Sequence, residues 1–333
     1  MKPTSYIFLV VAIIISCIGL IICQTAKKKA EAEGIEIFSQ TLDENNNSVY
    51  TFPFGEGEIY DKINLTLGDA DVNIVGGYTE PYIEIVNFRE GSYMMTTSNR
   101  IISIDTTIDI MSILMFWESG YTFNGFRNYV HRFNEDEKVN AKQVNIYLPA
   151  DTTVHSINIK IDSGDVSVTN LNADVDLIVD INRGDAEFSS FTTSSGVTAS
   201  IDVGNVYLYE TTLNSFDATI YTTGDVTTRA FTFNRMNVVG KNTSVNIDAT
   251  KELFLYDINL SAVNGKVSVD GEEKGGTYYY DSYDTTGLSV TVTTSGGDIT
   301  MTKSDYIPPE DIGTDTDAES DTESSTDTEG AGE

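Results

Sequence analysis

The chain has 333 residues and a strongly acidic balance, with 51 acidic residues against 20 basic ones and a formal net charge of −31. A field of this sign repels phosphate groups, so nucleic acid is excluded as an expected partner. The hydrophobic share of 40% suffices for a substantial core. Both cysteines, Cys17 and Cys23, lie in one N-terminal apolar run, so we expect neither a disulfide nor thiol chemistry elsewhere.

After a short N-terminal flank, residues 1–5, an uncharged apolar run extends from Tyr6 to Cys23. As a helix this run would span about 27 Å, which is enough to cross the hydrocarbon core of a bilayer. No small-residue cleavage site follows it, so the run predicts an uncleaved transmembrane helix at 6–23 and a juxtamembrane linker at 24–49. A lipoprotein-like site ending at Cys17 is the less favoured alternative, because the apolar run continues past that cysteine.

The charges around this run leave its orientation open. Lys27, Lys28 and Lys29 follow the run directly, and the positive-inside rule would place that side in the cytoplasm. We favour an extracellular location for the large domain, because of the resemblance described below.

A β-rich domain is predicted from about residue 50 to residue 305. Its first coil is indicated by alternating apolar residues at Ile63, Leu65 and Leu67, a turn at Gly68-Asp69, and a second alternating segment at 72–74. An apolar residue at every second position is typical of a strand with one buried face.

Residues 111–137 form an apolar and aromatic insertion unlike the rest of the domain. We favour a cap or flap over one end of the fold, since an exposed sheet edge invites pairing with other chains. The alternative is an exposed loop that contacts a membrane or a partner. In that case the partner-binding candidates are Phe116, Trp117, Tyr121, Phe123 and Phe126.

A repeat with a period of twenty residues determines the predicted fold. Glycines recur at Gly164, Gly184, Gly204 and Gly224, each followed by Asp or Asn. Alternating apolar residues precede each glycine, as at Ile157, Ile159 and Ile161, while Asp162, Asn182 and Asp202 are expected to point away from the core. One such unit cannot bury its apolar face alone, but stacked units can. The sequence therefore predicts an all-β solenoid, a β-helix-like stack of about 20-residue strand-turn-strand coils.

The fourth unit has its apolar residues one position early, at Phe216, Ala218 and Ile220. A slip of one residue turns side chains to the opposite face, so we predict a β-bulge near Tyr221. Weaker copies of the turn continue at 242–245, 264–267 and 296–299.

The lead-in VNIYLP at 144–149, the turn SGDVSV at 163–168 and its copies TGDV and GGDI carry a family resemblance. Over roughly residues 140–302 the chain resembles the bacterial "putative adhesin" family of β-strand repeat proteins, a domain of unknown function. The resemblance implies a surface or membrane-associated bacterial protein, with some relatives linked to envelope stress. It defines no catalytic residue.

Two segments follow the repeats. Residues 272–286 predict a Gly/Tyr-rich loop, in which Tyr278, Tyr279 and Tyr280 either stack on a sugar ring or a partner or, as we favour, pack against the sheet edge. Residues 306–333 lack basic side chains and predict a disordered, solubilising acidic tail.

The remaining polar patterns give few candidates for chemistry. A row of Asp165, Asp185, Asn205 and Asp225 on neighbouring coils could share Ca²⁺, but it lacks the dense ligand spacing of calcium-binding repeats, and we favour solvated turn residues. The Arg-Gly-Asp tripeptide at 183–185 is interpreted as one more corner of the repeat. The two histidines, His131 and His155, suggest no metal-ligand spacing and no nucleophilic triad. Neither a cofactor nor an enzymatic activity is expected.

The leading hypothesis is a single-pass, membrane-anchored bacterial surface protein acting as a non-catalytic binding or adhesion module. Its expected partners are a membrane, through residues 6–23, and a cell-envelope protein or a glycan. The alternative is a regulatory or scaffold protein of the cell-envelope stress response that acts through a membrane protein partner.

Overall fold

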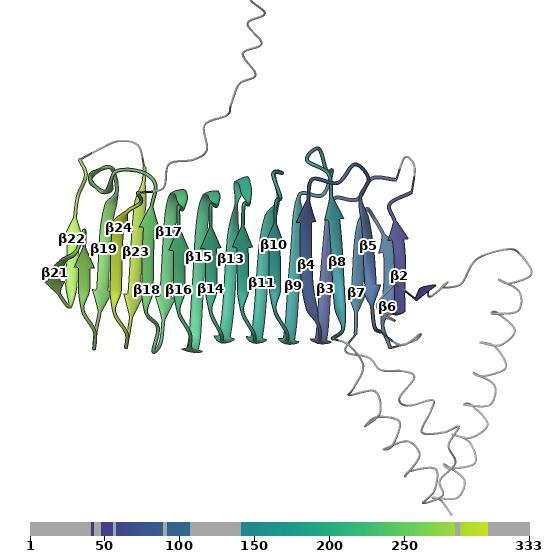
Figure 1. Cartoon of the computed structure of the whole chain (residues 1–333), viewed down its shortest axis with the longest axis horizontal. Helices are drawn as coiled ribbons and strands as arrows, with labels where there is room; N and C mark the ends of the chain where they lie inside the picture. Colours follow the sequence, from purple (N-terminus) through teal and green to yellow (C-terminus); the bar gives the residue numbers. More distant parts are fainter. Residues whose placement is uncertain are drawn as a thin grey trace, which may run out of the picture.

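The computed structural model describes residues 41–42, 48–55, 58–88, 92–106, 141–283 and 287–305. Within these ranges the chain is all-β: strands form one sheet of 13 and one of 11, and the one helical turn is the short 3-10 segment η1 (Leu253–Leu255). Figure 1 shows the strands side by side along the long axis, with the N-terminal strands at one end and the C-terminal strands at the other. Among the described residues, no helix combines the length and apolar character needed to cross a bilayer, and the run 6–23 lies outside them.

Sheet A is the larger sheet. Its strands are, in spatial order, β1 (Thr41–Leu42), β2 (Ser48–Pro53), β5 (Tyr82–Val86), β8 (Gln143–Leu148), β4 (Asp71–Gly76), β10 (Val166–Thr169), β12 (Ala186–Ser189), β14 (Val206–Tyr209), β16 (Val226–Arg229), β18 (Val245–Ala249), β24 (Ile299–Lys303), β20 (Val267–Val269) and β21 (Glu272–Gly275).

Sheet B is the smaller sheet. Its strands are, in spatial order, β22 (Thr277–Tyr280), β19 (Asp257–Ala262), β23 (Ser289–Thr294), β17 (Thr232–Gly240), β15 (Thr212–Thr223), β13 (Thr192–Val203), β11 (Asp176–Arg183), β9 (Ser156–Ser163), β3 (Lys62–Asp69), β7 (Ile101–Asp105) and β6 (Met94–Ser98).

The predicted solenoid is confirmed in the central region, where each coil contributes one strand to each sheet. β9 continues through a glycine corner into β10, and the next coil repeats this with β11 and β12. The register is parallel and shifted by one period, so that Ile159 pairs with Val179 and Val166 with Ala186. Stacking the coils in this way places identical positions of successive repeats next to each other.

The core lies between the two sheets. Ile157, Ile159 and Ile161 of β9 are buried, as are Val166 and Val168 of β10. Asp162, Asn182 and Asp202 are exposed, as the alternation predicted. Each fully buried Ile or Val stabilises the fold by roughly 2 kcal/mol relative to exposure, so the ladder of apolar residues along the stack is the main source of stability.

The predicted bulge near Tyr221 is confirmed. Ile201 of β13 pairs with Ile220 of β15, but Val203 pairs with Thr223, so β15 carries an extra residue beside Tyr221. A second irregularity lies earlier in the same pair, between Thr193 and Gly196, where β13 carries the extra residue. The two shifts compensate, which keeps the glycine corners in register.

The N-terminal end is more complex than a first coil. β3 and β4 form the predicted coil, and they pack directly on β9 and β10, with Leu65 beside Ile159 and Val72 beside Val166. Further strands extend both sheets beyond it, and several are antiparallel, namely β2, β5 and β6. β1 and the start of β2 lie within 24–49, so the prediction of a linker over that whole range is wrong.

At the C-terminal end the chain order and the spatial order differ. β23 lies between β17 and β19, and β24 lies between β18 and β20, so the last coil of the chain is inserted between two earlier ones. The outermost strands are β21 and β22, both antiparallel to their neighbours. The prediction of a loop over 272–286 is therefore wrong for these two segments, which instead close the two sheets.

Candidate binding surfaces

The repeated glycine corner is a point of close contact between coils. Gly184 has a φ of 144°, and a Cβ built on it would lie 1.9 Å from the carbonyl oxygen of Gly164 in the preceding coil. Gly204 repeats the arrangement, with a Cβ position 1.8 Å from the carbonyl oxygen of Gly184. No other residue fits such a contact, which explains why glycine recurs at this position.

The row of Asp and Asn after each glycine is a hydrogen-bonded ladder. Oδ1 of Asp165 accepts the backbone N–H of Asp185 at 2.8 Å, and Oδ1 of Asp185 accepts the N–H of Asn205 at 2.7 Å. The pattern continues in the next two coils. Oδ1 of Asn205 accepts the backbone N–H of Asp225 at 2.9 Å, and Oδ1 of Asp225 accepts the N–H of Ser244 at 3.0 Å. Each side chain therefore bonds the backbone of the next coil, a role that either Asp or Asn can fill.

These hydrogen bonds explain why Asp or Asn recurs at the four positions proposed as metal ligands, with no need for a metal ion. In the part of the chain that the structure describes, no group of three His, Cys, Asp or Glu side chains could hold a metal ion. The Arg-Gly-Asp tripeptide has the same explanation, since Gly184 forms the corner and Asp185 forms the ladder.

The three candidate tyrosines of β22 do not form one surface. Tyr278 and Tyr280 are half-buried and pack against the core, paired with Leu260 and Ile258 of β19. Tyr279 points outward and is 73% exposed. The favoured interpretation, rings packed against the sheet edge, is therefore correct for two of the three residues.

The same end presents two more exposed aromatic side chains. Phe254 is 60% exposed and Tyr283 is 91% exposed. Asp257 holds the segment before Tyr283, because its Oδ1 accepts both the backbone N–H and the hydroxyl of Ser282, at 3.0 and 2.8 Å. These two bonds, the backbone bond first, lower the pKa of Asp257 below its usual value.

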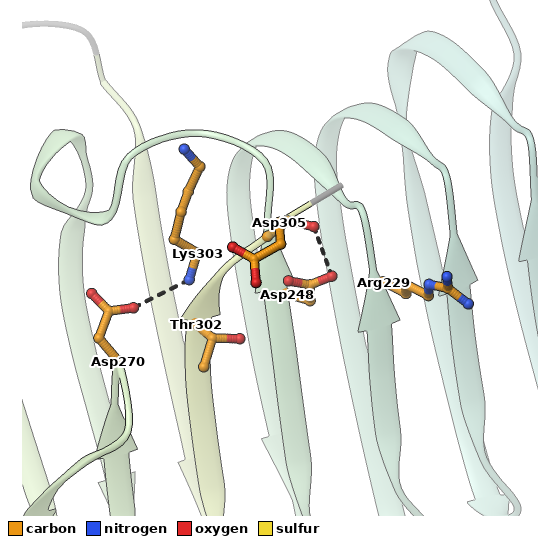
Figure 2. Close-up of a pocket in the computed structure, with 7 residues that line it drawn as sticks. Arg229, Asp248, Asp270, Thr302, Lys303 and Asp305 are labelled. Carbon is orange, nitrogen blue, oxygen red and sulfur yellow. Dashed lines mark hydrogen bonds between the residues drawn. The ribbon is translucent and has the colours of Figure 1, made fainter. Parts of the chain in front are cut away.

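A second feature missed at the sequence level is an open depression of roughly 640 Å³ at the carboxyl ends of strands in sheet A (Figure 2). It is lined by Arg229, Asp248, Asp270, Thr302, Lys303, Ser304 and Asp305. These residues come from β16, β18 and β24 and from the segments after β20 and β24, so only the non-sequential order of coils brings them together.

Most polar groups around the depression already have partners. Asp248 accepts hydrogen bonds from the Ala230 N–H and the Ser304 hydroxyl, both at 2.9 Å. Lys303 forms an ion pair with Glu252 at 2.6 Å, and its backbone N–H donates to Asp270 at 3.2 Å. These bonds hold the last strand in place.

Near the N-terminal end, three tyrosines cluster on the outer face of sheet A. The rings of Tyr82 and Tyr147 stack at 4.3 Å, and Tyr78 meets Tyr147 edge-on at 4.6 Å. The Tyr147 hydroxyl donates to Glu84 at 3.1 Å, and burial followed by the Glu84 charge raises the pKa of Tyr147. The rings contact one another and leave no space between them for a ligand.

The insertion candidates Phe116, Trp117, Tyr121, Phe123 and Phe126 lie outside the described residues.

The fold and these surfaces define a class: a two-sheet parallel β-repeat domain whose repeated corners are structural. A family model, Toastrack DUF4097, matches residues 60–302, and the chain belongs to this family. The family match supports the predicted resemblance to adhesin-type β-repeat proteins. A search of curated proteins found no match.

Solved structures with similar chain paths are distant in sequence. A "putative cell adhesion protein" from Clostridium sporogenes is 11% identical, with 77% of this chain and 98% of that chain covered and a TM-score of 0.35. A "putative lipid binding protein" from Parabacteroides distasonis is 12% identical, with coverage of 78% and 96% and a TM-score of 0.38. A "putative adhesin" from Bacteroides fragilis is 10% identical, with coverage of 79% and 98% and a TM-score of 0.35.

Proposed function

We propose that this protein is a membrane-anchored bacterial surface protein whose β-repeat domain is a non-catalytic binding or adhesion module. The main support for this proposal is the structural role of the repeated polar residues. The Asp and Asn row, which offered the candidates for metal binding, uses its Oδ1 atoms to hydrogen-bond one coil to the next. Exposed side chains available for contact include Tyr221 of β15 and Tyr279 and Tyr283 near the C-terminal end of the stack.

The physical character of the stack supports a binding role. Each coil contacts its neighbours through two parallel ladders and a shared core, so the domain holds its faces and ends rigidly in place. A rigid scaffold lowers the entropy cost of binding. The apolar run at 6–23 supports attachment to a membrane, and the partner would be a cell-envelope protein or a glycan.

A second candidate function has one observation in its favour. Lys27, Lys28 and Lys29 follow the apolar run, and by the positive-inside rule they favour a cytoplasmic location. In that case the domain would be a regulatory or scaffold protein of the envelope stress response that acts through a membrane protein.

Labelling of intact cells separates the two candidates. A Ser325→Cys variant is exposed to a membrane-impermeant thiol reagent, with the unsubstituted chain, which keeps Cys17 and Cys23, as the control. Labelling of the variant alone in intact cells is expected. Protection that is lost on lysis would reject the surface location and favour the scaffold. Loss of adhesion or partner capture on deletion of the gene then tests binding itself.

A further inference from the structure

The two sheets end differently at the C-terminal end of the stack. Sheet A ends in β21, whose side chains include Glu272, Glu273 and Lys274. Lys274 pairs with Glu272, and Lys266 of the neighbouring segment pairs with Glu273 at 3.0 Å. Charged side chains on an outer strand discourage pairing with other chains, so the edge of sheet A is blocked.

Sheet B ends in β22, which has the sequence TYYY and carries neither a charge nor a proline. The pairing geometry shows which of its backbone groups point outward. The carbonyl of Gly276 accepts the N–H of Ala262 at 2.8 Å, in line with the register that joins Tyr278 to Leu260 and Tyr280 to Ile258. Hydrogen-bonded and non-bonded pairs alternate in an antiparallel ladder. Thr277 and Tyr279 are therefore the non-bonded positions, and their N–H and C=O groups point away from β19.

The outward backbone groups of Thr277 and Tyr279 have no partner among the described residues. Both side chains are exposed, and Tyr279 stands on the outer face beside Asn259. The edge is thus a ready template for one more strand, with an exposed aromatic ring at its centre.

The charges around this edge indicate the chemistry of the strand. Asp257 and Asp281 are exposed beside β22, and the nearby lysines of β21 and its neighbour are already paired with glutamates. A second copy of this chain would bring the same acidic groups against these, which costs free energy. A segment with basic flanks would instead be attracted.

We propose that β22 is a docking site for an extended peptide segment of a partner protein, which adds to sheet B as an edge strand and carries basic residues beside its paired core. This inference rests on the proposed function, because it names the site and the partner class of the binding module. The strand's backbone bonds to Thr277 and Tyr279 supply affinity, while Tyr279, Asp257 and Asp281 select apolar and basic side chains.

The test uses the full chain, purified in detergent, and two synthetic peptides measured by fluorescence anisotropy. The first peptide alternates Val and Thr and has two Lys at each end; the second has the same side chains but N-methyl groups on alternate residues. The first is expected to bind, and the second to bind at least about tenfold more weakly, because N-methylation removes the donors that edge pairing needs.

Two substitutions at one position separate the backbone from the ring. Tyr279→Pro removes the outward N–H but breaks no bond to β19, since that N–H points away from the sheet, and it is expected to weaken binding at least about tenfold. Tyr279→Thr keeps the N–H and removes the ring, so a smaller loss is expected. Thr97→Lys, on the equally uncharged β6 at the other end, is the matched control and should leave binding unchanged.

Several outcomes overturn the proposal. These are equal binding of both peptides, unchanged binding by Tyr279→Pro, loss of binding through Thr97→Lys, or a dimer of the unsubstituted chain that Tyr279→Pro converts to monomer. If Tyr279→Pro does not fold, the two peptides still decide. If the peptides do not bind but Ser325→Cys is labelled in intact cells, only the docking site is rejected. If the first peptide binds but Ser325→Cys is protected in intact cells, only the surface location is rejected.

Discussion

The central coils, residues 156–229, and the C-terminal end, residues 232–303, are built from the same strand-corner-strand unit but differ in how the chain fills space. In the centre each coil stacks on the one before it, as when Val166 pairs with Ala186 and Ala186 with Val206. At the C-terminal end Met236 pairs with Val290, and a later coil separates two earlier ones. The same local chemistry thus supports a sequential stack and a rearranged one.

The difference shows that the corner residues determine how one coil folds. They do not determine which other coil stacks against it. Asp185 bonds the next coil of the chain, but Asp298 bonds the N–H of Lys266, which belongs to an earlier segment, at 2.8 Å. Any coil with a matching corner and apolar ladder can occupy the next place in the stack. Substitutions in the two regions can test how far this equivalence extends.

The largest effect is expected from Gly204→Ala in the centre. A Cβ there would lie 1.8 Å from the carbonyl oxygen of Gly184, and backbone atoms of two coils cannot both remain in place. We expect the free energy of unfolding to fall by at least about 3 kcal/mol, measured by urea denaturation.

Gly271→Ala at the C-terminal end is the matched control. Its φ is 77°, yet nothing lies within 4 Å of the added Cβ, so only backbone strain of about 1 kcal/mol is expected. Equal losses for the two variants would show that strain in φ, rather than contact between coils, makes the central glycines necessary.

Tyr256 provides a pH-dependent test at the C-terminal end. Its ring is fully buried, its hydroxyl donates to the carbonyl of Phe233 at 3.2 Å, and burial raises its pKa. The native state therefore keeps this proton at pH values where the unfolded chain has lost it. Its contribution to stability is complete below about pH 10 and falls as the pH rises further.

We accordingly expect the unfolding midpoint to fall above about pH 10, and to fall less steeply in Tyr256→Phe. At neutral pH the substitution should cost about 1 kcal/mol, because the hydrogen bond from the Tyr256 hydroxyl to the Phe233 carbonyl is lost, while Nζ of Lys251 still donates to that carbonyl at 3.3 Å. Tyr221→Phe, at an exposed ring in the centre, should keep the steep fall. An identical pH profile for Tyr256→Phe and the unsubstituted chain would contradict the assignment.

The ladder allows a direct comparison of the two regions. Asp185→Ala and Asp298→Ala each remove the acceptor of a backbone N–H, so each should cost about 1 kcal/mol, and Asp185→Ala somewhat more because Oδ1 of Asp185 also accepts from Nδ2 of Asn205 at 3.1 Å. Asp185→Asn should cost less, since Asn205 fills the same role. Added calcium is expected to leave the thermal midpoint unchanged. A neutral Asp298→Ala beside a costly Asp185→Ala would indicate that the last coil is not held where the structure has it.

The sequence predicts the centre well because its signals are local. Glycine and Asp at a spacing of twenty residues, with apolar alternation before them, specify both the corner and the buried face, and the slip at Phe216 even locates the bulge at Tyr221. The non-sequential end has no such signal. Thr277–Tyr280 consists of residues that favour strands, but Gly275 and Gly276 precede it directly, and its pairing with β19 depends on which coil lies alongside.

The candidate surfaces follow the same division. The Asp and Asn row was correctly located from the sequence, but its hydrogen bonds to the next coil are visible only once the coils are stacked. The depression around Asp248 and Lys303 was missed, since its residues meet only through the inserted β24. Tyr279 was named with its neighbours, and only strand pairing distinguishes it from Tyr278 and Tyr280.

The smallest expected effect concerns the second corner of each coil, where the centre meets the rearranged end. Residues at this corner have φ near +50°, a region that favours Gly and Asn: Asn170 at 54°, Ser190 at 51°, Glu210 at 51° and Ala230 at 53°. Alanine is strained in this conformation, and glycine is not. Ala230→Gly relieves this backbone strain but loses one buried methyl group, so we expect a net stabilisation of about 0.5 kcal/mol. Asn170→Gly, where the native residue already tolerates the conformation, should be close to neutral. Thermal unfolding of both variants in parallel provides the measurement, and a destabilised Ala230→Gly would mean that packing of this methyl group outweighs backbone strain at the boundary between the two regions.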